Sequence, residues 1–388
     1  MASPRPAIAR AASVGPVLRV SGAAGVGIVE DRYHGGVTVD RLVGFDWRRA
    51  LRLAARLGLA MWFAYWSWQT TRSYFESFPY HLDMLGFDAR IYLHAAQTWF
   101  AGGDPWTAYA FQHSWAAGAA DVAYYFTGPP PTVLAFVPFS WLADGAFTAG
   151  WMALTVGAAF YSLRRLRLPP WWILFPPLAQ AVFVGNPHVV CLALILSGSS
   201  VLQSIAPAAK AYAVLPMIAE RQWRALGLFA VVGAFSVVIL WPLWAQYAAD
   251  FPRIEAWISS ATLGGFSAAR DPRLFAIVAA ALGALWLVDR RAAGWLVVPA
   301  LWPAAEYFYA TFALPLRSPW LAAALAVPAT QAAAFVPWTI VAYAVVRLVQ
   351  ALGTRDAPDD GLAQPSDEMG GPDAEMAGHR RIDIPGPA

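Results

Sequence analysis

The amino-acid sequence predicts an all-α polytopic membrane protein with about 10–12 transmembrane helices. Hydrophobic residues make up 59% of the 388 residues, and charged residues make up only 13%. An ordinary soluble domain carries roughly 25% charged residues, so this chain has about half the usual charge. Apolar runs near the roughly 17–25 residues that cross a bilayer recur along the chain. Its 20 tryptophans fit the aromatic belts at membrane surfaces.

Two polar ends flank the predicted membrane domain. Residues 1–45 are rich in Ala, Gly, Pro and Arg without sustained periodicity, and we expect a disordered cytoplasmic leader rather than a signal peptide. Residues 353–388 are acidic, rich in Pro and Gly, and lack Phe, Tyr and Trp. Such a tail cannot bury enough apolar surface to offset its ordering entropy, so it is predicted to be a disordered cytoplasmic tail. The membrane domain is expected over residues 46–352.

The first membrane helix is predicted at about residues 48–70. Arginines are enriched on the cytoplasmic side of membrane helices. Four of them precede the apolar part of this run, Arg48, Arg49, Arg52 and Arg56. The helix is therefore expected to leave the membrane on the outer side. Residues 71–128 then form a long extracytoplasmic loop.

Further apolar runs lie near 129–143, 146–163, 169–184, 188–204, 205–219, 222–246, 271–288, 292–316 and 319–350. The basic turns ERQWR at 220–224 and DRR at 289–291 are expected on the cytoplasmic side. RRLR at 164–167 should be cytoplasmic too, but simple alternation from the first helix places it outside. The sequence therefore leaves the topology of residues 129–219 open, with a re-entrant run as one solution.

The composition also narrows the classes of function. The net charge of +3 is spread over loops and forms no basic cluster, so no nucleic-acid partner is expected. Cys191 is the only cysteine, which excludes an intrachain disulfide and a cysteine metal cage. The histidines His81, His94 and His113 form no HxxxH pair, so a metal site is not indicated. A divalent metal is left open.

The most polar outward segment reads GFDARIYLHAAQTWFAGGDPW, residues 86–106. We expect a juxtamembrane helix here, with Asp88 at or near its N-cap and Tyr92 and Ala95 on the same face as Asp88. Glycines and a proline end the helix. The simplest interpretation is that Asp88 only caps a surface helix. The functional one is that Asp88 acts as a base, with Asp83 as its rival.

Two further ionisable residues lie inside apolar runs. Lys210 is in SIAPAAKAYAVLPMI, and Glu306 is followed by Tyr307 and Tyr309. Ionisable groups at membrane depth are costly and face a partner, a cavity or a pathway. Either the two groups pair or snorkel, or Lys210 neutralises a lipid phosphate while Glu306 hydrogen-bonds a sugar or orients a base.

Six short motifs follow one another in a characteristic order. They are GFD-x3-Y-x2-A, GGDPW, YY-x3-PPP, FVGNPH, AAKAYAVLP and P-x2-EY. Their order and spacing resemble bacterial glycosyltransferase family 87 (DUF2029), the polyprenyl-phosphate-mannose-dependent α-(1→2)-mannosyltransferase type. The resemblance covers about residues 50–345.

The resemblance implies a GT-C-like fold in the bacterial inner membrane, with the active site on the periplasmic side. It implies an inverting transfer of a hexose, mannose, from a polyprenyl-phosphate donor to a glycan or glycolipid acceptor. The residues themselves do not demand a cofactor. Matched to the family motifs, Asp88 is the base, Lys210 is the basic residue, and Asn186 follows the glycine before His188. Where the family often has Asp or His, this chain has Glu306 and Tyr307. By this resemblance we expect Glu306 at the catalytic site and Asn186, His188 and Tyr307 at the substrate.

Chemistry adds expectations about the remaining residues. A lipid phosphate that leaves needs positive charge or amide donors, which suits Lys210 or an interfacial arginine such as Arg270. Tyr92 is expected beside the substrate, on the Asp88 face. The main alternative is a transporter or flippase for a lipid-linked sugar, with Lys210 and Glu306 as pathway charges.

Overall fold

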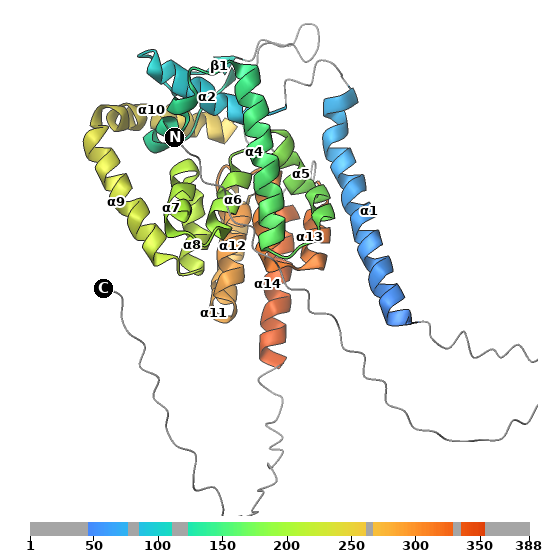
Figure 1. Cartoon of the computed structure of the whole chain (residues 1–388). Helices are drawn as coiled ribbons and strands as arrows, with labels where there is room; N and C mark the ends of the chain where they lie inside the picture. The colour runs from blue at the N-terminus through green and yellow to red at the C-terminus, as the bar shows by residue number, and fades with distance from the viewer. Residues whose placement is uncertain (1–45, 77–84, 111–122, 261–266, 329–334, 354–388) are drawn as a thin grey trace, which may run out of the picture. The chain divides into compact units, whose positions relative to one another are not determined.

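The structure, a computed structural model, describes residues 46–76, 85–110, 123–260, 267–328 and 335–353 (Figure 1). The predicted leader, the predicted tail beyond residue 353 and Asp83 lie outside the described residues. Internal contacts divide the chain between Leu51 and Arg52. The described part of the first unit is the start of one helix, where Asp46 Oδ1 accepts a hydrogen bond from the Arg49 amide at 3.1 Å. The second unit begins at Arg52 and holds the remaining described helices and strands.

The described chain is helical, as predicted, apart from one antiparallel ribbon of two short strands, β1 (Tyr109–Ala110) and β2 (Ala123–Tyr124). The α-helices are α1 (Trp47–Glu76), α2 (Phe87–Phe100), α3 (Pro130–Phe136), α4 (Asp144–Arg165), α5 (Pro176–Phe183), α6 (His188–Leu196), α7 (Ser200–Ala209), α8 (Val214–Ala219), α9 (Trp223–Ile239), α10 (Trp241–Ser260), α11 (Pro272–Val288), α12 (Arg290–Leu301), α13 (Pro319–Leu325) and α14 (Phe335–Gly353). Short 3₁₀ helices are η3 (Val137–Phe139), η4 (Pro170–Leu174), η5 (Ala211–Ala213), η6 (Ala268–Arg270) and the longer η7 (Tyr307–Leu316).

Few of the described helices could cross a membrane unbroken. By length and composition two can, α4 and α14, or four if the bent pairs α5–α6 and α9–α10 each count as one span. This is fewer than the 10–12 predicted. The apolar runs exist, but glycine, proline and extended residues break several of them into helices too short to span a bilayer.

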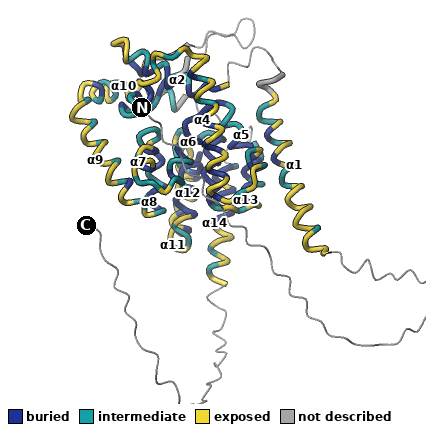
Figure 2. Tube along the Cα trace, viewed as in Figure 1, coloured by how far each residue is buried: buried dark blue, intermediate teal, exposed yellow. Residues whose placement is uncertain are grey.

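The predicted first membrane helix is present as α1, but it is not among the candidate spans. Its apolar part, Leu57–Trp68, lies between an arginine-rich first half and a polar end, QTTR. Large side chains along it, such as Met61 and Trp62, are exposed (Figure 2). The Trp62 indole donates to the Ala323 carbonyl at 2.9 Å, and Ser67 donates to Leu174 at 2.7 Å.

The basic turns gather at one end of the unit, here called the arginine end. Arg165 at the end of α4 donates to the Leu196 carbonyl at the end of α6. Gln222, in the turn before α9, donates to Ile195, and Arg291 pairs with Glu220 at 2.7 Å. The chain therefore leaves the arginine end after α4, bends by 115° between α5 and α6, and returns to the same end. The run before RRLR, at 129–143, contains the seven-residue helix α3, which is too short to cross a bilayer and so does not force RRLR to the outer side.

Three helical hairpins of this kind place their connecting segments close together, away from the arginine end. The breaks lie at 184–187 between α5 and α6, at Lys210 between α7 and η5, and at 302–306 between α12 and η7. We call these three segments the hairpin tips. They carry Asn186, Lys210 and Glu306, so the polar residues of the apolar runs stand where the helices break.

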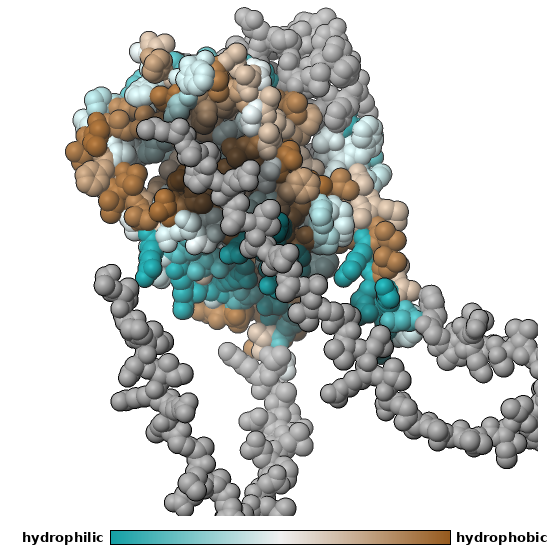
Figure 3. Space-filling view, viewed as in Figure 1, coloured by the Kyte–Doolittle hydropathy of each residue, from teal (hydrophilic) through white to brown (hydrophobic). Residues whose placement is uncertain are grey.

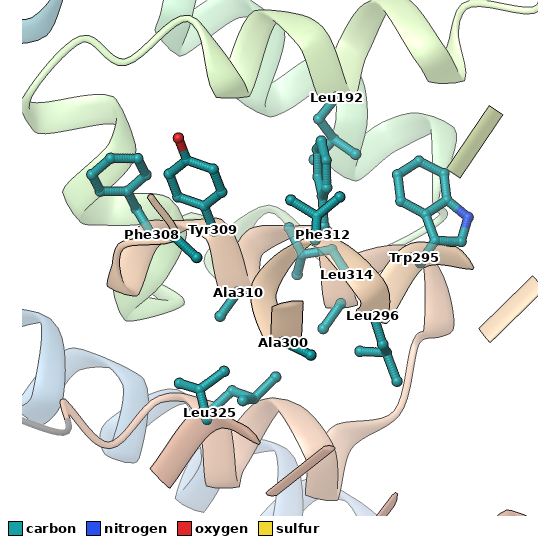
Figure 4. Packing of buried hydrophobic residues seen from close by; sticks show 14 of the residues in the cluster. Leu192, Trp295, Leu296, Ala300, Phe308, Tyr309, Ala310, Phe312, Leu314 and Leu325 are labelled. Carbon is teal, nitrogen blue, oxygen red and sulfur yellow. The ribbon is translucent and has the colours of Figure 1, made fainter. Parts of the chain in front are cut away.

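Two apolar cores hold the tips in place. The larger packs the hairpins against α11–α14, and Figure 4 shows its layer around η7, with Trp295, Phe312 and Leu325. The smaller packs α2 against α3, α4 and α10, around the fully buried Trp106. Asp88, on α2, lies where the two cores meet.

Candidate functional site

Two glycines dock the start of α2 onto the first hairpin tip. The Gly86 amide donates to Phe183 at 3.0 Å, and the Asp88 amide donates to Val184 at 2.9 Å. The Trp151 indole holds the other side of the tip through the Gly185 carbonyl at 2.7 Å. These bonds fix α2 across the break between α5 and α6.

Both glycines are required by conformation and by space. Gly86 and Gly185 have φ values of +66° and +68°, which L side chains rarely adopt. A Cβ on Gly185 would lie 2.9 Å from the Gly86 Cα, and a Cβ on Gly86 would lie 2.7 Å from the Thr148 methyl. Any side chain at residue 185 would therefore push the start of α2 away from the tip.

Gly185→Ala is expected to destabilise the protein by about 1–3 kcal/mol through the strained backbone. It should also lower activity about 100-fold, because an ångström of displacement at a reacting group has effects of that size. Thermal unfolding in detergent and initial rates measure the two effects. Gly157→Ala is the matched control, since a Cβ there meets nothing within 4 Å. Equal behaviour of the two variants would contradict the docking argument.

The Asp88 side chain does not cap α2, which corrects the simplest sequence interpretation. Gly86 is the N-cap residue and makes no side-chain cap, while Asp88 lies in the first turn. Asp88 Oδ2 instead accepts a 2.5 Å hydrogen bond from Asn186 Nδ2. Asn186 Oδ1 in turn accepts from the His188 amide at 2.9 Å. Asn186 therefore orients the carboxylate from the hairpin tip.

The other two tips bring charge to Asp88. Lys210 lies over the Tyr92 ring, with Nζ 5.2 Å from the ring centre, and is within electrostatic range of Asp88 and Glu306. Burial raises the pKa of the Asp88 carboxyl above its ordinary value, while the Asn186 hydrogen bond and the Lys210 charge oppose that rise. The site therefore contains a carboxyl poised to take up a proton, next to a cation.

A cavity of about 730 Å³ begins at this cluster. Its polar end is lined by Tyr92, Lys210, Tyr212 and Tyr309. This end brings together side chains from α2, the second tip, η5 and η7. Asp88 and Glu306 lie next to it rather than in its wall.

The far end of the cavity is apolar. One helix face of α10 lines it through Trp244, Tyr247 and Phe251, and α9 contributes Phe229 and Val237. The outer face of α9 carries exposed apolar side chains, which Figure 3 shows as a brown area over that helix; they are Val231, Val232, Phe235, Val238 and Ile239. The cavity thus runs from the Lys210 cluster to a largely apolar helix pair, on which Glu255 is the ionisable lining residue.

Of the two tyrosines that follow Glu306, Tyr309 lines this cavity and Tyr307 does not. Tyr307 is buried and donates its hydroxyl to the Ala326 carbonyl at 2.6 Å. A 3₁₀ helix has three residues per turn, so Tyr309 and Phe312 share one face of η7 and Tyr307 lies on another. Tyr309 lines the cavity, and its hydroxyl points away from the η7 ribbon (Figure 4). The residue spacing of an α-helix would not have predicted which of the two tyrosines lines the cavity.

The remaining predicted residues surround the site without lining the cavity. His188 is fully buried behind Tyr212, and its Nδ1 lies 2.9 Å from the Tyr212 hydroxyl. Arg270 donates to the carbonyl of Ile258, a cavity residue, at 2.9 Å. His94 hydrogen-bonds Thr98 at 3.3 Å, and His81 and His113 lie outside the described residues. Within the described ranges, no three His, Cys, Asp or Glu side chains are placed to hold a metal ion.

The structure thus brings together Asp88, Tyr92, Asn186, Lys210 and Glu306 from segments far apart in the sequence. It adds Tyr212 and Tyr309, which sequence reasoning missed as site residues. Comparison with family models, curated proteins and solved structures finds no match for this chain.

Proposed function

We propose that this protein is an integral-membrane inverting glycosyltransferase. It moves a hexose, mannose by the sequence resemblance, from a polyprenyl-phosphate donor to a glycan or glycolipid acceptor. One observation carries the proposal: the Lys210 ammonium group lines the polar end of a cavity whose other walls are mostly apolar, and the Asp88 carboxylate lies next to that end. A lipid-linked sugar phosphate has polar and apolar groups in the same order, because its sugar and phosphate are joined to a long hydrocarbon chain.

In the proposed reaction, the acceptor hydroxyl oxygen bonds to the anomeric carbon while the bond from that carbon to the phosphate oxygen breaks. The electron pair of the broken bond leaves with the phosphate, and the hydroxyl proton passes to Asp88. One direct displacement inverts the configuration, as in inverting glycosidases. Lys210 stabilises the charge that grows on the phosphate. Asn186 holds Asp88 in place, and Glu306 hydrogen-bonds a sugar hydroxyl.

The apolar end suits the isoprenoid chain. Phe251 on α10 and Phe229 and Val237 on α9 offer hydrocarbon and ring surface along this path, although Glu255 of α10 also lines the cavity. α9 and α10 meet at an angle of 93°, so α10 turns away from the direction of α9. In a membrane, the donor would enter sideways between these helices and place its phosphate at Lys210.

The distribution of arginine supports an orientation. Basic turns mark the cytoplasmic side of membrane proteins. The arginine end gathers Arg165, Arg290 and Arg291 with the α8–α9 turn, on the side away from the tips. We therefore propose that the site faces the periplasmic side of a bacterial inner membrane, within a GT-C-like fold.

Broken helices with polar residues at their breaks also occur in transporters, where they hold the substrate near the bilayer centre. The three hairpin tips give a transporter or flippase for a lipid-linked sugar some support. The carboxylate of Asp88, held by Asn186 next to the polar end of the cavity, favours the enzyme, because a base is needed only for transfer.

The test is a transfer assay with purified full-length protein in detergent. The protein receives radiolabelled polyprenyl-phosphate-mannose and a membrane-lipid extract from the organism that encodes it. Label moving into a new glycan or glycolipid supports the enzyme. Movement of intact labelled donor across proteoliposome membranes, with no new product from any acceptor, would establish the flippase instead.

The raised pKa of Asp88 predicts the pH dependence of transfer. A base works only when ionised, so kcat/KM should fall at low pH, through a pKa above the ordinary value for aspartate. Asn186→Ala removes a hydrogen bond that favours the ionised form, so the acid limb should move to higher pH. A pH–rate profile of both proteins measures the shift. If the acid limb of kcat/KM for Asn186→Ala were unchanged or moved to lower pH, Asp88 would not be the group whose ionisation controls the rate.

A further inference from the structure

A chain of three polar side chains runs from the core to the cavity wall. His188 Nδ1 lies 2.9 Å from the Tyr212 hydroxyl, and the Tyr212 and Tyr309 rings lie with centres 5.0 Å apart, so that their hydroxyls interact. His188 is fully buried and Tyr212 nearly so, while Tyr309 lines the cavity beside Lys210. Buried polar groups of this kind hold one another in fixed orientations.

The inner end of the chain is held rigidly. The His188 amide donates to Asn186, the residue that also holds Asp88. The His188 ring stacks on Phe312, with ring centres 4.1 Å apart. The imidazole therefore has one fixed plane, and its Nδ1 is directed at Tyr212.

The unpartnered nitrogen of His188 indicates the direction of the chain. Among the described residues, Nε2 is buried without a hydrogen-bond partner. A buried N–H without an acceptor is rarer in proteins than a buried acceptor without a donor. The neutral form with the proton on Nδ1 is therefore favoured. Nδ1–H then donates to Tyr212, and the Tyr212 hydroxyl donates to Tyr309.

In this order the Tyr309 proton is the only one left over, and it is available to the cavity. A phosphate has several oxygens that accept hydrogen bonds, and donors that are already oriented stabilise it most. Lys210 supplies charge at this end, within electrostatic range of Tyr309. The opposite order would leave Tyr309 with only an acceptor, which a phosphate does not need.

We propose that Tyr309 donates a hydrogen bond to the phosphate of the lipid donor, and that His188 and Tyr212 are positioning residues that orient its hydroxyl. This inference rests on the proposed function. It names a second phosphate ligand beside Lys210 and gives His188 a role at a distance from the substrate.

The test measures binding, not transfer. Full-length protein in detergent is titrated with undecaprenyl phosphate, and separately with undecaprenol, which lacks the phosphate. Tyr309→Phe and Tyr212→Phe should each weaken phosphate binding about tenfold, the size of a lost hydrogen bond to a charged group. Binding of undecaprenol should not change. The double variant should be no weaker than Tyr309→Phe alone, because the two hydroxyls act in series.

Tyr307→Phe is the matched control. It removes the same kind of hydroxyl two residues earlier in the chain, and that hydroxyl donates to the Ala326 carbonyl. It should leave the affinity for undecaprenyl phosphate unchanged. The inference would be overturned if Tyr309→Phe bound undecaprenyl phosphate with wild-type affinity, or if the double variant lost the sum of the two single-variant binding energies. Either result would leave the proposed function standing. A wild-type protein with no preference for the phosphate over the alcohol would overturn both.

Discussion

Asp88→Asn is expected to lower kcat for transfer by about 10²–10⁴-fold, the usual contribution of a general base. The amide keeps an oxygen that can accept the Asn186 hydrogen bond, so the start of α2 should stay docked on the first tip. What is lost is the ability to take the acceptor proton. The variant should therefore fold and bind donor while failing to react.

The measurement is the initial rate of label transfer at saturating donor, with donor affinity and thermal unfolding measured on the same samples. Asp144→Asn is the matched control, because Asp144 lies in the first turn of α4 and outside the donor cavity. It should retain wild-type rates. Transfer that survives Asp88→Asn would keep the enzyme and move the base to Glu306 or Asp83.

Much of the candidate site could be predicted because its ionisable residues lie in sequence surroundings where a charged group is energetically unfavourable. Lys210 and Glu306 lie in apolar runs, where an ionisable group has to be matched by a partner or a cavity. Asp88 stands in the most polar outward segment. Each of these signals is local in the sequence, and the structure brings all three residues into electrostatic range.

The way the residues meet could not be predicted from the sequence. The runs at 188–204 and 205–219 are apolar throughout, and their composition does not distinguish one span from two short helices with a turn. The tip at Lys210 depends on one extended residue, with φ −147° and ψ 106°. Without these breaks, the sequence predicts 10–12 spans, where two to four of the described helices qualify by length and composition.

The position of Tyr307 has a similar cause. Tyr307 directly follows Glu306 in the sequence, but η7 continues as a 3₁₀ helix for ten residues. Such runs usually end after three or four residues, so no sequence rule anticipates one of this length. The three-residue period aligns Tyr309 with Phe312 and sends Tyr307 to Ala326.

Lys210→Met is expected to lower kcat by about 10²–10³-fold, the loss seen when one group that stabilises transition-state charge is removed. Methionine preserves much of the apolar stem, so packing over the Tyr92 ring should largely remain. The phosphate would then leave without a neutralising charge. Lys210→Arg should restore part of the rate, since it returns the charge in a different shape.

The same substitution should also change the pH profile, which separates it from a packing defect. The Lys210 charge lowers the pKa of Asp88, although burial still holds that pKa above its ordinary value. Without Lys210 the pKa rises further, so the acid limb of kcat/KM should move to higher pH. Arg224→Met, which removes an exposed charge near the start of α9, should change neither rate nor profile. A slow Lys210→Met enzyme with an unshifted limb would mean that Lys210 serves the phosphate alone and does not act on the base.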